Sequence, residues 1–199
     1  MKRFALSIIL AAGGLLAASA GLKPGDNAVE FTLKNVDGTM VSLSDYGEKE
    51  GVILVFTCNP CPFAKAYEER IIRLHEKYDP ARFPVVAINP NDDGISPDDS
   101  FEKMQARAKE KQYPFPYLKD ETQEIYMAYG AARTPHVYLL QKKGKKFRVA
   151  YIGAIDDNAM DASKVTRHYL DDAIRAVKAG EAPAPATTKA VGCSIKTKK

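Results

Sequence analysis

Two runs of consecutive apolar residues form the framework of this chain. Residues 52–56 and 83–88 are apolar at almost every position, which is typical of strands buried on both faces of a sheet. After the first run, apolar residues recur at spacings of three or four and predict a helix; they are Ala64, Tyr67, Ile71, Leu74 and Tyr78. Buried strands separated by helices predict an α/β domain with a covered central sheet.

Weaker patterns predict the elements around this centre. Residues 28–43 alternate around Asp37-Gly38, a dipeptide typical of a hairpin turn, and predict an N-terminal β-hairpin. Residues 136–140 and 147–152 predict two further strands, which a turn rich in lysine and glycine joins into an antiparallel pair.

Three more helices are expected. Ser96 and Pro97 are typical of a helix N-terminus, so a helix should begin there. Residues 121–129 predict a short helix that ends at Gly130, and residues 163–179 predict the last helix. This order of strands and helices favours a central mixed sheet flanked by helices.

The N-terminus has the pattern of a secretory signal peptide. Lys2 and Arg3 precede an apolar segment, and Ala18-Ser19-Ala20 fits the small-residue cleavage pattern. We therefore expect residues 1–20 to be removed after Ala20 and the protein to be exported, most simply into a bacterial periplasm. Residues 21–179 then form one domain, and residues 180–199 form an extended Ala/Pro linker and tail.

Charge and length exclude two classes of protein. The full chain carries 29 Lys and Arg against 25 Asp and Glu, a net charge of +4, which falls to +2 when the signal peptide is removed. A charge of this size provides no electrostatic basis for nucleic-acid binding. No later segment has the apolar length of a membrane span, so the mature protein is expected not to span a membrane.

The three cysteines are the candidate chemical groups. Cys58, Cys61 and Cys193 are too few for a disulfide-stapled scaffold, which favours a chemical role. Cys58 follows the first buried strand and is expected at the start of the next helix, where unpaired N–H groups and the helix dipole stabilise a thiolate. We expect Cys58 to attack and Cys61 to resolve the mixed disulfide. A structural disulfide and half of a zinc site are the alternatives.

The position of Cys58-x-x-Cys61, with Thr134-Pro135 before a later strand, resembles the thioredoxin superfamily. Within it the chain is similar to AhpC/TSA (redoxin, peroxiredoxin-like) proteins, over essentially the whole mature chain. The strings that carry this likeness are residues 58–62, 114–118, 120–123, 155–158 and 192–196. The resemblance implies a thioredoxin-like fold without a cofactor. It also implies exchange with protein or small-molecule thiols and disulfides, including a membrane-bound or periplasmic redox partner.

The resemblance also implies roles near the proline. Pro135 should follow a cis peptide bond and pack against the cysteine pair, and the backbone of Thr134 should pair with a substrate chain. Arg133 either lies near the thiolate and lowers its pKa or is merely exposed. The chain departs from thioredoxin because residues 52–56 contain no acid to accept a proton.

Two alternative functions follow from the same residues. A thiol peroxidase is one, although peroxiredoxins place a threonine three residues before the reactive cysteine, whereas Thr57 is one residue before Cys58 and four before Cys61. The other is a copper metallochaperone that binds through Cys58, Cys61 and His136, since thiolates and imidazole suit copper. Otherwise His136 is an ordinary histidine of the sheet.

Cys193 has two interpretations. An extended tail covers ~3.3 Å per residue, so it can reach almost any point of the domain. The tail could fold back so that Cys193 exchanges with the Cys58–Cys61 pair or with a partner thiol, or Cys193 is a free thiol on a disordered end. The sequence as a whole predicts an exported thiol–disulfide oxidoreductase.

Overall fold

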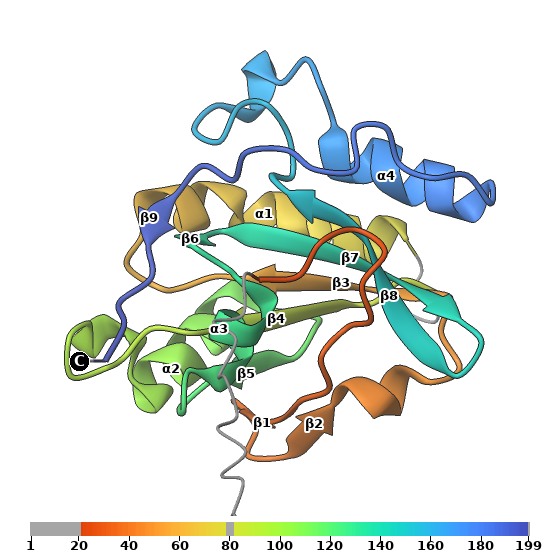
Figure 1. Ribbon diagram of the computed structural model, residues 1–199. Helices are drawn as coiled ribbons and strands as arrows, with labels where there is room; N and C mark the ends of the chain where they lie inside the picture. The colour runs from red at the N-terminus through yellow and green to blue at the C-terminus, as the bar shows by residue number, and fades with distance from the viewer. Residues whose placement is uncertain (1–20, 79–81, 199) are drawn as a thin grey trace, which may run out of the picture.

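A seven-stranded mixed sheet forms the centre of the computed structural model, which describes residues 21–78 and 82–198 (Figure 1). The predicted signal peptide lies outside these residues. The strand order is β2-β1-β5-β4-β3-β7-β8. These strands are β1 (Thr32–Asn35), β2 (Met40–Ser42), β3 (Gly51–Phe56), β4 (Val85–Asn89), β5 (Tyr117–Lys119), β7 (His136–Lys143) and β8 (Lys146–Gly153). Strands β3, β4 and β5 are parallel and the outer pairs are antiparallel, which confirms the predicted mixed sheet.

Helices cover both faces of this sheet. The helices are α1 (Pro62–Lys77), α2 (Phe101–Lys111), α3 (Glu124–Tyr129) and α4 (Tyr169–Lys178). Successive side chains of a strand point to opposite faces. In β3, Ile53 and Val55 join the core under α1 and α4, whereas Leu54 and Phe56 join the core under α3. The uninterrupted apolar run of β3 is therefore what a doubly covered sheet requires.

Both predicted hairpins are confirmed. In the first, Thr32 pairs with Ser42, and the Asp37 carboxylate accepts a hydrogen bond from the backbone N–H of Thr39 at 2.8 Å. Gly38 has a positive φ of 90°, the left-handed conformation that its turn needs. In the second hairpin, β7 pairs with β8 along its length.

Three helices after the cysteine motif begin later than the sequence predicts. Helix α3 starts at Glu124 instead of residue 121, because Gln123 before it has a positive φ of 64°. The last helix starts at Tyr169, because the backbone N–H of Thr166 donates to the Asp157 carboxylate and holds the preceding residues in a loop. Pro97 starts only a 3-10 turn, and α2 begins at Phe101 with Ser100 as its N-cap. The side chain of Ser100 accepts from the backbone N–H of Lys103.

The C-terminal tail runs back across the domain instead of extending away from it (Figure 1). Its middle pairs with β8, where the N–H of Ile152 donates to the Ala186 carbonyl and the N–H of Thr188 donates to the Ile152 carbonyl. Its end forms β9 (Cys193–Ser194), which pairs antiparallel with β6 (Arg133–Thr134). The tail thus places Cys193 beside the cysteine pair.

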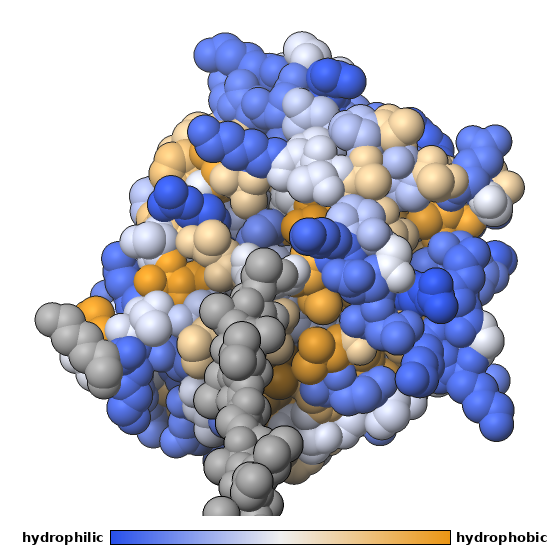
Figure 2. Space-filling model, in the orientation of Figure 1, coloured by the Kyte–Doolittle hydropathy of each residue, from blue (hydrophilic) through white to orange (hydrophobic). Residues whose placement is uncertain are grey.

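The surface in the view of Figure 2 mixes residue types, with hydrophobic residues in several patches separated by hydrophilic ones. None of the helices within residues 21–78 and 82–198 is long and apolar enough to cross a membrane.

Candidate active site

The cysteine motif lies in the loop between β3 and α1. Cys61 is the N-cap of α1 and Pro62 is its first helical residue, so Cys58 precedes the helix instead of starting it. Proline is favoured at the first helical position, and it disfavours the helical conformation at the residue before it. Pro62 therefore sets the start of the helix, and the prediction that Cys58 lies at this N-terminus is wrong.

The sulfur atoms of the motif converge on Thr134. A disulfide joins Cys61 to Cys193, and Cys58 is the free thiol. The Cys58 Sγ lies 3.0 Å from the Thr134 hydroxyl, and the Cys61 Sγ lies 3.2 Å from the Thr134 carbonyl oxygen. Cys58 and Cys61 also belong to one buried apolar cluster, with Cys193 packed against it. All three sulfurs therefore lie within one small region of the molecule.

The Thr134–Pro135 peptide bond is cis, as the sequence predicted. The residue that pairs with Thr134 across the two strands is Cys193 of the tail. The position at which the resemblance places a substrate chain is thus occupied by this chain's own C-terminus. This arrangement matches the fold-back interpretation of Cys193.

Burial makes Cys58 a weak acid. Its side chain is only 4% exposed, and this desolvation raises the pKa of its thiol to about 11. The hydrogen bond to Thr134 lowers the pKa and the negative charge of Asp99 raises it, both by less than burial does. The expected thiolate at Cys58 is therefore wrong for this state of the molecule, in which Cys58 remains a neutral thiol at neutral pH.

A buried carboxylate, that of Asp99, accepts a hydrogen bond from the loop that carries the cysteine motif. Asp99 is fully buried, and its Oδ1 accepts hydrogen bonds from the Asn59 backbone N–H at 2.7 Å and from the Asn89 amide at 2.8 Å. Its Oδ2 accepts from the Asn91 amide at 2.8 Å and from the Ser96 hydroxyl at 2.7 Å. This acid supplies a negative charge near Cys58 from a segment other than β3. Sequence reasoning missed it because Asp99 resembles an ordinary first-turn acid of a helix.

The other predicted residues lie apart from the sulfurs. Arg133 is exposed on β6. The ring of His136 packs against Tyr138 at 4.9 Å between centroids, accepts from the Ala132 N–H through Nδ1, and has a pKa lowered to about 4 by burial. Among the described residues no group of three His, Cys, Asp or Glu side chains is arranged to hold a metal ion. In this state, with Cys61 in a disulfide, Cys58, Cys61 and His136 do not form such a group, and the copper alternative stays a prediction.

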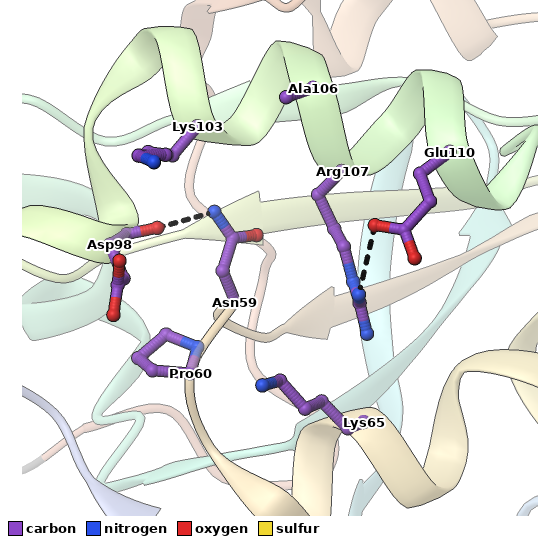
Figure 3. Close-up of a pocket in the computed structure, with 8 residues that line it drawn as sticks. All are labelled: Asn59, Pro60, Lys65, Asp98, Lys103, Ala106, Arg107 and Glu110. Carbon is purple, nitrogen blue, oxygen red and sulfur yellow. Dashed lines mark hydrogen bonds and ion pairs between the residues drawn. The ribbon is translucent and has the colours of Figure 1, made fainter.

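A pocket behind the motif does not reach the sulfurs. Asn59 and Pro60 form one wall, with α1 and α2 beside them, and Lys65, Lys103 and Arg107 bring positive charge (Figure 3). Within this wall, the side-chain amide of Asn59 donates a hydrogen bond to the backbone carbonyl of Asp98 at 2.7 Å. None of the three cysteines lines this pocket. The pocket therefore lies next to the motif loop but apart from the sulfur atoms.

Replacing Asp99 tests whether its hydrogen bonds support the motif loop. In Asp99→Asn, one carboxylate oxygen becomes an N–H₂ group that faces two donors, so at least two buried hydrogen bonds are lost. We expect the free energy of unfolding, measured with urea, to fall by about 2–4 kcal/mol. Asp98→Asn is the matched control, since Asp98 is exposed, and should leave the unfolding midpoint unchanged. Equal midpoints for the two variants would contradict the supporting role.

Comparison with known proteins identifies the family. The AhpC/TSA family model matches residues 24–146. The thiol-disulfide oxidoreductase ResA of Geobacillus thermodenitrificans is 27% identical over 154 residues, which cover 73% of this chain and 82% of that protein.

Two crystal structures share the fold over nearly the whole chain. A conserved protein of Geobacillus kaustophilus is 39% identical with a TM-score of 0.80, and the match covers 90% of this chain and 95% of that one. The hypothetical protein SMc02350 of Sinorhizobium meliloti is 31% identical with a TM-score of 0.81, covering 90% and 97%. The chain therefore belongs to the AhpC/TSA family of thioredoxin-like oxidoreductases.

Proposed function

We propose that the protein is an exported thiol–disulfide oxidoreductase that uses Cys58 and Cys61 as its redox pair. One observation carries the proposal: a disulfide at Cys61 lies beside the free thiol of Cys58, with both sulfurs in contact with Thr134. A disulfide next to a thiol is the arrangement from which thiol–disulfide exchange proceeds. The substrates are thiols and disulfides of proteins or small molecules.

The geometry favours Cys61 as the sulfur that meets the substrate. As the N-cap of a 16-residue helix, Cys61 lies beside unpaired N–H groups and the positive end of the helix dipole, which stabilise a thiolate. Both cysteines are buried in this state of the molecule, but Cys58 does not cap the helix, and the raised pKa of its thiol suits the thiol that resolves a mixed disulfide. This assignment reverses the roles that the position in the sequence suggests.

The proposed cycle balances in electrons and protons. The Cys61 thiolate attacks a substrate disulfide, one substrate sulfur leaves as a thiolate, and the other stays bonded to Cys61. Cys58 then loses its proton and attacks the Cys61 sulfur, so a Cys58–Cys61 disulfide forms and the second substrate sulfur leaves and takes up a proton. The substrate gains two electrons, which the cysteine pair supplies.

Export rests on the N-terminal pattern of residues 1–20. In an exported protein the oxidising environment allows disulfides to persist. Mass spectrometry of protein purified from a cell envelope extract should find a chain that begins at Gly21. A chain that retains Met1 and stays with the cytoplasmic fraction would contradict export.

Serine variants test the roles of the cysteines. In an assay of disulfide reduction with a dithiol as electron source, Cys61→Ser should abolish turnover. Cys58→Ser combined with Cys193→Ser should abolish it while a mixed disulfide at Cys61 accumulates, because Cys193 can then no longer bond to Cys61 in place of Cys58. Cys193→Ser alone is the matched control and should keep turnover, because the redox pair remains. Full turnover by the double variant would contradict the proposal. Cys61-dependent consumption of hydrogen peroxide, without disulfide turnover, would instead identify a thiol peroxidase.

The acidity of Cys58 predicts a pH profile. Burial disfavours the thiolate and raises the pKa to about 11, so below that value each unit of pH increases the thiolate fraction about tenfold. Alkylation of Cys58 by iodoacetamide in the oxidised protein, followed by mass spectrometry, should therefore rise continuously between pH 7 and pH 10. An exposed thiol would reach a plateau above its ordinary pKa of about 8.5. Such an early plateau would contradict the assigned burial.

A further inference from the structure

The end of the tail lies across the cysteine site as an extended strand. Cys193 pairs with Thr134, and beyond it the tail continues alongside the loop that leads from β4 to α2 (Figure 1). Ile195 packs against the hydrophobic core beneath α3, and the Thr197 hydroxyl lies 2.7 Å from the Tyr126 hydroxyl. The tail therefore fills a continuous surface that begins at the sulfurs.

This surface binds the tail mainly through main-chain groups of the tail. The N–H of Lys196 donates to Asn91 Oδ1 at 2.8 Å, and its carbonyl accepts from the Asp92 N–H and from Gln123 Nε2, both at 2.9 Å. The N–H of Lys198 donates to Gln123 Oε1 at 2.7 Å. The side chains of both lysines are exposed. Main-chain contacts of this kind accept many sequences.

Asn91 and Gln123 are built for this contact. They are 2% and 3% exposed, and their amides are fixed from within the domain: Asn91 donates to Asp99, and Gln123 donates to the Pro90 carbonyl at 2.6 Å. The tail contributes to this burial, so without it the amides would have to bond to water in place of Lys196 and Lys198. The inner hydrogen bonds therefore hold both amides in position to receive an extended chain.

We propose that this surface is the docking site for an extended, cysteine-bearing segment of a partner protein, and that residues 191–198 occupy it as an internal substitute. The inference rests on the proposed function and adds the class of substrate to it. The Cys61–Cys193 disulfide occupies the position that a mixed disulfide between Cys61 and a partner's cysteine would take. The contacts require a chain that stays extended for five residues after its cysteine, with an apolar side chain two residues after it.

The residue before the cysteine must be small. A Cβ atom on Gly192 would lie 2.2 Å from the carbonyl oxygen of Thr134 and 2.7 Å from its carbonyl carbon. These are backbone atoms of β6 and cannot move aside without disturbing the cysteine site. A partner segment of the form Gly-Cys-x-apolar fits the surface, whereas glutathione has only a single glycine after its cysteine and cannot reach the positions of Ile195 and Lys196.

Thiol exchange can release the tail without an added oxidant or reductant. The Cys58 sulfur loses its proton and attacks Cys61, a Cys58–Cys61 bond forms, and the Cys61–Cys193 bond breaks. Cys193 leaves as a thiolate and takes up a proton. The surface is then open to a partner.

Activated disulfides test this proposal in the reduced, full mature chain. One is a peptide with the sequence of residues 191–198, and the other is glutathione; each carries nitrothiobenzoate on its cysteine, so that attack by the protein releases a coloured thiolate. We expect the peptide to react at least tenfold faster. N-methylation at the position of Lys196 should slow the peptide about fivefold, as loss of one hydrogen bond predicts. N-methylation at the position of Thr197 is the matched control, because no hydrogen bond from its N–H is found.

A variant of the protein tests whether the tail occupies the docking site. Gly192→Ala should speed the reaction with both reagents, because the tail no longer fits, whereas Lys189→Ala, an exposed tail residue, should match the wild type. Equal rates for peptide and glutathione, or equal rates for the two methylated peptides, would overturn the docking site. Equal rates for Gly192→Ala and Lys189→Ala would overturn its occupation by the tail. Absence of reaction with either reagent would instead count against the proposed function.

Discussion

The site depends on the contact of one residue, Thr134, with all three cysteines. Its hydroxyl meets Cys58, its carbonyl oxygen meets Cys61, and its backbone pairs with Cys193. Thr134 is fully buried at the end of β6 and is followed by the cis bond to Pro135. Three segments that are far apart in the sequence meet at this residue. The arrangement of the three cysteines therefore depends on the position of β6.

The two cysteines of the motif share one buried apolar cluster but differ in the charges around them. Cys61 caps a helix, where N–H groups favour negative charge, whereas the Asp99 carboxylate disfavours it at Cys58. The loop between them is fixed by the hydrogen bonds that Asp99 accepts. The raised pKa of Cys58 therefore arises from the framework around the motif and not from the motif alone.

Much of the fold follows from local patterns, and the errors have physical causes. The buried strand β3 and both hairpins were predictable, because each depends on a few adjacent residues, whereas the cis bond before Pro135 was predicted from the family resemblance. The start of α1 was misplaced because the effect of Pro62 was overlooked, although proline at a first helical position is a visible signal.

Long-range contacts were harder to predict. The role of Asp99 arises from side chains that converge on it across the sheet, and no spacing in the sequence announces them. The position of the tail depends on pairing with β8 and β6. The Gly192-Cys193 dipeptide could have indicated a close approach to another backbone, since glycine permits it.

The pairing of the tail with β8 affects how a partner protein competes with the tail for the cysteine site. The hydrogen bonds between residues 186–188 and Ile152 do not involve the disulfide, so they can still hold the tail to the domain when the Cys61–Cys193 bond breaks. A short tether of this kind holds its end at an effective concentration of about millimolar. A dilute partner must therefore bind far more tightly than the tail, or arrive already close by, before it can displace a segment that never leaves the molecule.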